Sequence, residues 1–319
     1  MRVRFPLPAP DFQRHDHEHR SAARRGGIVA GLGSGAGCNQ MQGTAMAIES
    51  KELAVTYYPI PKSGSSSVKY ALMALGGKDT DFPDPDNEVH SHLPTNHVDP
   101  FRPLRDAHKR RFTIVRDPLE RLLSAYSNRI RDARVMARPS AQKDKLERFG
   151  IPVDPDLDTF ILNVEKYCAS SWEVRFHVAS LRYFTGGSLF QFERVFRFER
   201  MDEVGAFLSS LGGRALDLPR LQAAATKLGP SDMSPEALAK AMRFCRYDYG
   251  FLVDYYDARK WGGIPEGDAG EPSTLHVFGD PAVWRDGRLI VPRTPRNFLH
   301  FMSKRPLVER DAVAGFQDL

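Results

Sequence analysis

Pro61-Lys62-Ser63-Gly64-Ser65-Ser66-Ser67 is a short polar segment between two apolar ones. It follows the apolar run 53–60, and it precedes a segment in which Val68, Leu72 and Leu75 recur at helical spacing. This order predicts a strand, a tight loop and a helix. A loop of small residues that opens a helix presents backbone N–H groups and the positive end of the helix dipole to an anion. Lys62 adds a mobile positive charge, so we expect a phosphate or sulfate group to bind here.

The loop differs from a Walker A loop, in which the lysine follows the second glycine. Here Lys62 precedes the single glycine, Gly64, and three consecutive serines follow. The pattern closely resembles the loop with which sulfotransferases bind the phosphosulfate group of their donor. That resemblance implies that Lys62 and residues 63–67 bind the donor. The alternative is a solvated loop that only caps a helix.

A second segment, Arg116-Asp117-Pro118-Leu119-Glu120-Arg121-Leu122-Leu123-Ser124-Ala125-Tyr126, follows the apolar run 111–115. Asp117 is a candidate N-cap, Pro118 takes the first helical position, and Glu120 would complete a capping box. An apolar face then follows at helical spacing: Leu119, Leu122, Leu123, Tyr126 and Ile130. Arg121, Ser124 and Asn128 lie on the opposite face. Arg116 therefore sits at the carboxyl end of a strand, where ligands bind in open α/β sheets.

Arg-Asp-Pro-x-x-Arg-x-x-Ser-x-Tyr resembles the segment that binds the 3′-phosphate of the donor in the same sulfotransferase family. The resemblance implies that Arg116 and Ser124 hold this phosphate of 3′-phosphoadenosine 5′-phosphosulfate (PAPS). An arginine suits the task because its planar fork can bind two phosphate oxygens at once. The alternative is a structural Arg–Asp pair at the start of a helix.

Two histidines, His90 and His92, lie between these segments. In an extended chain their spacing would place both on the same side. An alcohol that attacks sulfur must lose its proton, and histidine is the side chain that titrates near neutral pH. Uronyl 2-O-sulfotransferases carry a similar His-x-His before their Arg-Asp-Pro motif, which implies that these histidines serve the acceptor hydroxyl. The alternatives are surface histidines, or a metal pair that lacks a convincing third ligand; His97 and His108 are weaker candidates for the base.

The composition of the chain bears on its ligands, its partners and its location. The 319 residues are 41% hydrophobic with a net charge of +5, which suits a polyanionic donor. The basic residues are scattered and show no nucleic-acid-binding signature, so we expect no nucleic-acid partner. Three widely spaced cysteines, Cys38, Cys168 and Cys245, argue against a disulfide framework and favour a cytoplasmic location. We find neither an apolar run of about 18 residues nor a convincing signal peptide, and therefore expect no transmembrane segment.

Three parts follow along the chain: a disordered tail (1–45), a sulfotransferase domain (46–260) and a C-terminal extension (261–319). The tail contains two patterns that imitate a dinucleotide loop and a metal site, at residues 31–36 and 15–19, without the strand and helix that the first would need. In the extension, residues 283–291 predict a hairpin around Asp286-Gly287. A basic end follows it, either a solvated surface or a contact for an anionic acceptor: Arg293, Arg296, Lys304 and Arg305.

Strands alternate with helices through the domain. We expect a further strand at 194–198, helices at 157–164, 172–183 and 235–247, and a surface excursion at 138–155. The predicted fold class is α/β, a P-loop-like three-layer α/β/α arrangement with a central parallel sheet.

The sequence is thus identified as a soluble, bacterial-type member of the PAPS-dependent sulfotransferases, similar to the carbohydrate and uronyl 2-O-sulfotransferases. The resemblance implies transfer of a sulfuryl group from PAPS to a hydroxyl of a glycan, a glycolipid or a small molecule. Lys62, His90 and His92 would be catalytic, and no metal would be needed. The alternatives are a P-loop-like kinase and a non-catalytic protein that binds a nucleotide or a sulfoglycan.

Overall fold

The computed structural model describes residues 47–95, 110–185, 187–221, 227–266, 283–285 and 288–290. The chain divides into two units, 1–42 and 43–319, and all described residues belong to the second. The predictions made for the tail, His97, His108, Cys38 and the basic end lie outside the described residues.

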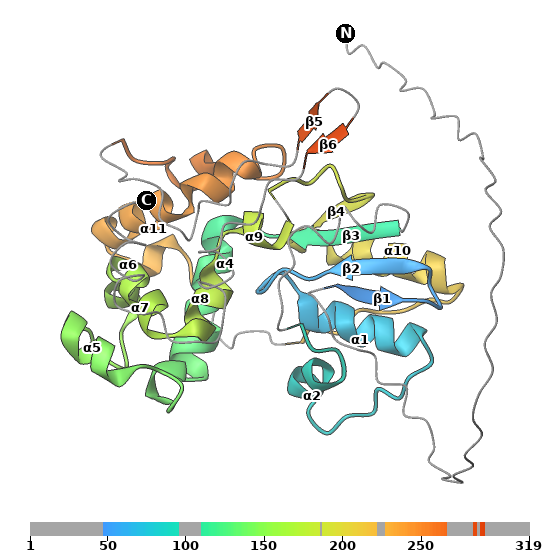
Figure 1. The fold of residues 1–319 in the computed structure, drawn as a ribbon, viewed down its shortest axis with the longest axis horizontal. Coiled ribbons are helices and arrows are strands. Elements are labelled where there is room, and N and C mark those ends of the chain that lie inside the picture. The colour runs from blue at the N-terminus through green and yellow to red at the C-terminus, as the bar shows by residue number, and fades with distance from the viewer. Residues whose placement is uncertain are drawn as a thin grey trace, which may run out of the picture. The chain divides into compact units, whose positions relative to one another are not determined.

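A four-stranded sheet forms the centre of the α/β part (Figure 1). Its order is β1 (Ile48–Ser50), β2 (Val55–Tyr58), β3 (Arg110–Val115) and β4 (Arg194–Arg197). β1 is antiparallel to β2, whereas β2, β3 and β4 are parallel, with Tyr57 opposite Phe112 and Ile114 opposite Phe196. The prediction of an α/β fold with a mostly parallel central sheet is confirmed.

One face of the sheet packs against α1 (Ser65–Leu75) and α10 (Met201–Gly212), which also contact each other. Tyr57 and Phe112 stack there at 4.8 Å between ring centroids, within the same apolar cluster as Val68 and Val204. On the opposite face, Phe192 packs edge-on against Tyr58. The described residues show this mixed sheet and its helices, and they do not establish the complete three-layer, P-loop-like arrangement.

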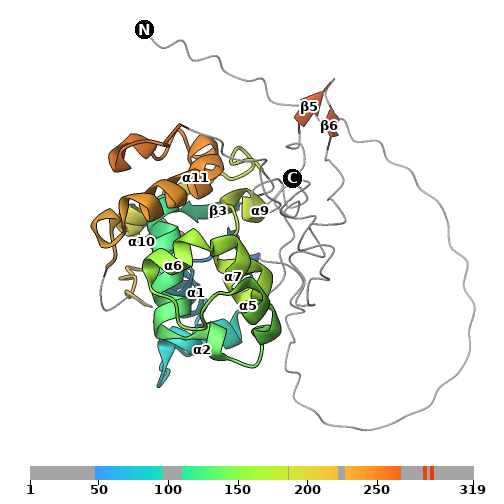
Figure 2. The same cartoon turned by 90° about the vertical axis from the view of Figure 1, so that its left-hand side faces the viewer.

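The remaining helices form a second apolar cluster beside the sheet. These helices are α4 (Pro118–Ala125), the π-helix η1 (Tyr126–Asp132), the 3-10 helix η2 (Val135–Ala137), α5 (Lys143–Phe149), α6 (Leu157–Leu162), α7 (Val164–Ser170), α8 (Trp172–Val178), α9 (Leu181–Thr185) and α11 (Pro235–Phe251). Figures 1 and 2 show α11 against α6, and α11 also packs on α4. Short 3-10 helices η3 (Phe198–Arg200), η4 (Pro230–Asp232) and η5 (Ala258–Trp261) complete the domain.

Three predicted segments differ in detail from the structure. The predicted helices 157–164 and 172–183 are each divided in two, at Asn163 and after Val178. The predicted surface excursion 138–155 contains α5, because Leu146 and Ile151 are buried against the second cluster while the charged residues between them face outward.

The segment with the two histidines is a helix, α2 (Pro85–His92), and not the predicted extended segment. Pro85 takes the first helical position, and the amides of Asn87 and Glu88 donate to the Asp84 carbonyl oxygen at 3.2 and 2.9 Å. On a helix, the side chains of residues two positions apart point in widely different directions. The expectation that His90 and His92 share one side is therefore wrong.

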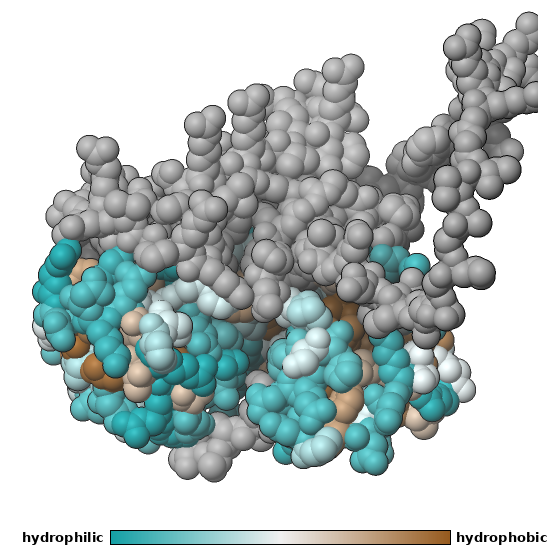
Figure 3. Space-filling view, turned by 60° about the horizontal axis from the view of Figure 1, so that its bottom comes forward, coloured by the Kyte–Doolittle hydropathy of each residue, from teal (hydrophilic) through white to brown (hydrophobic). Residues whose placement is uncertain are grey.

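Other local predictions are confirmed. Ser234 caps α11 by accepting from the Ala237 amide at 3.2 Å, and the hairpin pairs β5 (Val283–Arg285) with β6 (Arg288–Ile290). Cys168 and Cys245 are buried free thiols in the core. Seen from the side of α2 and α5, the described surface is mostly hydrophilic (Figure 3). Among the described helices, none combines the length and the apolar character that crossing a membrane requires.

Candidate anion-binding site

The loop after β2 begins with a strained turn. The Ser63 amide donates to the Ile60 carbonyl oxygen at 3.2 Å, with Pro61 and Lys62 as the two central residues. Lys62 has φ +66°, which is the left-handed value that the third position of a type II turn requires and that glycine usually supplies. A lysine held in this conformation stores of order 1–3 kcal/mol of strain, which points to a demand for its side chain.

Gly64 ends the loop at the N-cap of α1, with φ +79°. A Cβ atom there would lie 3.3 Å from Met201 and Phe198, so a larger residue would be strained by the backbone conformation and tightly packed. The first intrahelical bond runs from the Val68 amide to the Gly64 carbonyl oxygen at 3.3 Å, and no described side chain caps the helix. The amides of residues 64–67 are therefore the unsatisfied donors of a helix N-terminus.

The four serines of the loop have different surroundings. The Ser63 hydroxyl is buried and has no partner among the described residues. Ser66 Oγ lies 2.9 Å from His90 Nε2, and Ser67 Oγ accepts from the Leu221 amide at 3.3 Å. Ser65 is partly exposed at the first position of the helix. A buried unpaired hydroxyl next to unsatisfied amides fits an anion that is held at this loop.

Lys62 directs its ammonium group to the π-helix η1. Its Nζ donates to Asn128 Oδ1 at 2.8 Å. Burial, and secondly the positive charges of Arg129 and Arg116, lowers the pKa of Lys62 to about 7. This amine can therefore exchange a proton near neutral pH, and a bound anion would favour its charged form.

Arg116 ties the end of β3 to the loop. Its Nη1 donates to the Lys62 carbonyl oxygen at 3.0 Å, and its guanidinium group lies 4.3 Å from the centroid of the Phe198 ring. Glu120 Oε2 lies 3.8 Å from Nη2, while the buried Nε has no partner among the described residues. Arg116 thus retains an unused donor beside the loop, and Ser124 lies partly exposed on α4.

Arg121, which the sequence pattern placed on the face of α4 opposite the apolar residues, is almost completely buried. Its Nε donates to the Pro61 carbonyl oxygen at 3.0 Å and its Nη2 to the His177 carbonyl oxygen at 3.2 Å. Burial lowers the pKa of Arg121 to about 10. The loop and α8 cover this face of α4, so Arg121 supports the loop backbone rather than facing solvent.

Of the two predicted histidines, the structure brings His90 to the loop. His90 Nε2 contacts Ser66 Oγ, and Nδ1 lies 3.0 Å from the Nζ of Lys69. Burial, and secondly the charge of Lys69, lowers the pKa of His90 to about 3. His92 is exposed and stacks on Phe82 at 5.1 Å between ring centroids.

Several residues of this site were not singled out by the sequence. Arg129 donates from Nε to His177 Nε2 at 3.1 Å, and His177 Nδ1 donates to the Glu173 carbonyl oxygen at 2.7 Å, so that histidine is neutral. Burial holds the pKa of His177 well below its usual value. Asn128 follows Ser124 by one helical turn, which is a usable sequence signal. The position of Lys69 next to apolar helix positions is also visible in the sequence. The pairing of Arg129 with α8 has no signal in the neighbouring sequence.

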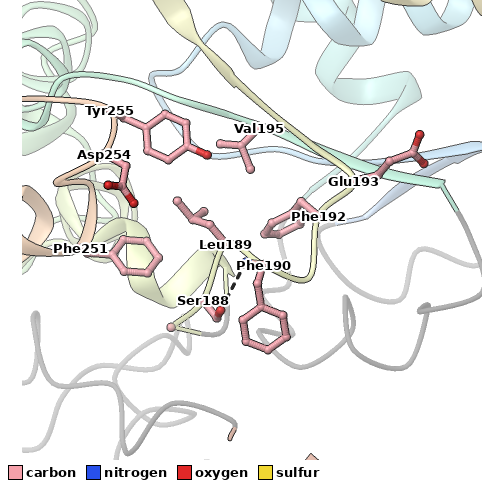
Figure 4. Close-up of a pocket in the computed structure, with 10 residues that line it drawn as sticks. Ser188, Leu189, Phe190, Phe192, Glu193, Val195, Phe251, Asp254 and Tyr255 are labelled. Carbon is pink, nitrogen blue, oxygen red and sulfur yellow. Dashed lines mark hydrogen bonds between the residues drawn. The ribbon is translucent and has the colours of Figure 1, made fainter. Parts of the chain in front are cut away.

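A hollow of about 460 Å³ lies elsewhere on the domain (Figure 4). It is lined by residues 187–190, Phe192, Glu193 and Val195, and by Phe251, Asp254 and Tyr255 from the end of α11 and the turn after it. None of the predicted site residues lines it. In the part of the chain that the structure describes, no group of three or more His, Cys, Asp or Glu side chains could hold a metal ion.

Comparison with known proteins identifies the family of the chain. No curated protein and no solved structure matches the chain. The model of the sulfotransferase family matches residues 46–240, which are more than half of the 319 residues and include Lys62, His90 and Arg116. The chain, in which a Pro-Lys-Ser-Gly loop follows β2 and an Arg-Asp-Pro segment follows β3, therefore belongs to the sulfotransferase family.

Proposed function

We propose that the protein transfers a sulfuryl group from PAPS to an acceptor hydroxyl. The observation that carries this proposal is the loop, where the unsatisfied amides of residues 64–67 and the unpaired Ser63 hydroxyl accompany the ammonium group of Lys62. These donors fit the 5′-phosphosulfate group of PAPS. The unused Nε of Arg116 and the hydroxyl of Ser124 fit the 3′-phosphate, which would fix the position of the donor.

In the proposed reaction the acceptor oxygen attacks sulfur in line with the bridging oxygen of the phosphosulfate. A new S–O bond forms, the old one breaks, and its electron pair remains on the phosphate of the leaving nucleotide. Lys62 and the loop amides stabilise the charge that develops on the bridging and terminal oxygens. His90 Nε2 takes the proton of the acceptor hydroxyl, which would occupy the place that Ser66 Oγ holds in the free protein.

The finer assignments are also proposals. The His-x-His resemblance favours a carbohydrate or glycoconjugate acceptor, with His92 as the second candidate for the base or as a group that orients the acceptor. The catalytic domain would span 46–260, with 1–45 as a dispensable tail, 261–319 as an extension that contributes to acceptor choice, and the cytoplasm as the location.

A radiolabelled transfer screen tests this proposal. The full chain is incubated with PAPS labelled in its sulfuryl group and with panels of glycans, glycolipids, phenols and alcohols. Label should move to a hydroxyl acceptor, and the desulfonated donor should raise the melting temperature of the protein. Stabilisation by ATP with magnesium and not by the desulfonated donor would contradict the proposal and favour a kinase. Stabilisation without transfer to any acceptor would favour a binding protein.

We expect transfer to survive chelation, because Lys62 and the loop amides supply the positive charge that a metal ion provides in many phosphoryl-transfer enzymes. The measurement is the transfer rate after treatment with EDTA, compared with the same sample resupplied with magnesium or zinc. Loss of the rate in EDTA with recovery on adding either metal would contradict this expectation.

A further inference from the structure

Lys69 is a buried lysine on α1 that neither sequence motif includes. It follows Ser66 by three residues, so both side chains lie on one side of the helix. Its Nζ lies 3.0 Å from His90 Nδ1 and donates to Thr95 Oγ1 at 3.0 Å, and neither partner is a carboxylate. A buried cation without an opposite charge is costly, so its retention needs a reason.

The protonation state of Lys69 determines how the His90 ring can bond. An ammonium group can only donate, so a charged Lys69 requires His90 Nδ1 to accept, and the ring proton then resides on Nε2 and points to Ser66 Oγ. A neutral amine has a lone pair that can accept a proton from Nδ1. In that state Nε2 is unprotonated at the loop.

We propose that Lys69 is a positioning residue that receives, through His90, the proton of the acceptor hydroxyl; this inference rests on the proposed function. The hydroxyl proton moves to His90 Nε2 as the S–O bond forms, and the Nδ1 proton moves to Lys69 Nζ. The imidazole ends neutral with its proton on Nε2, and the amine ends as an ammonium ion. Charge and protons balance without a further reactant.

The acidities of the two groups support this division of roles. A histidine whose pKa is about 3 is a weak final base, whereas burial places the pKa of Lys69 at about 7. Lys69 is therefore the better final acceptor of the hydroxyl proton, because its pKa lies close to neutral pH.

The surroundings of the pair are cationic. Lys62 and Arg129 lower the pKa of His90. Three described carboxylates on the helices packed against α1 are engaged elsewhere, since Glu88 accepts from the Asp84 amide and Asp202 and Glu203 pair with Arg200. Within the described residues, no carboxylate bonds to Lys69. A bound polyanion would raise the pKa of Lys69, so in the presence of donor the neutral amine forms only above pH 7.

The first test is the ring tautomer of His90, followed by ¹⁵N NMR in the full-length chain as a function of pH. In the wild-type chain the ring proton should move from Nε2 to Nδ1 as pH rises through about 7. Lys69→Arg should keep it on Nε2 throughout, because an arginine stays charged. A tautomer that does not change with pH would overturn the assignment.

The second test is the pH profile of kcat for sulfuryl transfer. The wild-type rate should rise about tenfold per pH unit to a plateau above pH 7, as expected for one group that must be unprotonated. Lys69→Arg should remain at least about 100-fold below that plateau, and Lys69→Met should lose the rise. Lys240→Met, which removes a helical lysine bound to Glu165, is the matched control and should retain the wild-type profile.

The two hypotheses fail in different ways. A wild-type profile in Lys69→Met would overturn the role of Lys69 and leave the sulfotransferase proposal intact. A chain that transfers no label, but whose His90 tautomer follows Lys69, would remove the proposed function and support the coupling of the two side chains.

Discussion

At the scale of single residues, Lys62 combines a left-handed backbone with a partly buried charge. We expect Lys62→Gly to raise the free energy of unfolding by about 1 kcal/mol, because glycine relieves the strained φ and the partly buried amine is removed. Sulfuryl transfer should fall by at least about 100-fold, as on loss of one transition-state donor. Urea unfolding and the transfer assay measure the two effects.

Arg134→Gly is the control for this prediction. Arg134 also has a left-handed φ, +47°, but it is exposed and pairs only with Asp154 at the surface. This variant should relieve similar strain and keep full transfer. A Lys62→Gly protein that is less stable than wild type would contradict the interpretation of the loop as strained.

Arg116 is predicted to bind the 3′-phosphate of the donor. Arg116→Ala should weaken the binding of the desulfonated donor by about 2–4 kcal/mol, as for loss of a charge-assisted bidentate contact. Arg110→Ala, at the start of β3, where the arginine is exposed and paired with Glu193, should bind like wild type. Titration calorimetry with the desulfonated donor makes the comparison, and wild-type affinity in Arg116→Ala would remove the assignment.

The sequence was informative where function depends on contiguous residues. Lys62 and Arg116 could be found because each belongs to a short motif whose neighbours fix its backbone. The partners of Arg121 and Arg129 could not, since they come from segments more than 40 residues away. For His90 and His92 the extended conformation was the wrong prediction. Asp84-Pro85 starts a helix, and this signal outweighs the apparent alternation of the two histidines.

At the scale of elements, Asp117 is more than an N-cap of α4. Its carboxylate accepts from the amides of Leu119 and Glu120, from the Tyr249 hydroxyl at 2.9 Å, and from the Trp261 indole. Asp117→Ala should lower the free energy of unfolding by about 2–4 kcal/mol, because a cap and two buried donors lose their acceptor.

Asp156→Ala provides the comparison. Asp156 caps α6 through a single bond to the Thr159 amide at 2.8 Å and lies at the surface, so its loss should cost only about 1 kcal/mol. Urea denaturation of both variants measures the difference. Equal losses would show that the contacts from α11 and η5 add nothing to the cap.

Element prediction succeeded where apolar runs were strong. Strands β2, β3 and β4 and helix α11 follow directly from pattern and caps. The breaks inside 157–170 and 172–185 were missed because Asn163 and Ala179 are not the glycines and prolines that usually mark a helix end. The positions of these helix ends depend on tertiary packing, which the local sequence pattern does not indicate.

At the scale of the whole molecule, the buried Lys69 and the partly buried Lys62 couple the free energy of unfolding to pH. The pKa values of Lys62 and Lys69 lie at about 7 in the folded protein, below their usual value of about 10.5. Between these limits the unfolded chain binds more protons, so the contribution of both lysines to the free energy of unfolding should increase as pH rises from 7 towards 10.

Anion binding should show the opposite trend. The desulfonated donor favours charged lysines, so its affinity should fall between pH 7 and pH 9, and binding at pH 8 should take up protons. Calorimetry in buffers of different ionisation heat measures this uptake. In the double variant Lys62→Met and Lys69→Met the uptake should disappear, and an unchanged uptake would assign it to other groups.

The row of unsatisfied amides at the start of α1 has a consequence for how long the protein persists in a cell. Donors and buried cations that lack their anion make the empty protein less stable than the filled one, so ligand supply changes the fraction of molecules that open and reach proteases. Under the proposed function, the abundance of the protein would then follow the supply of PAPS, without any dedicated regulator.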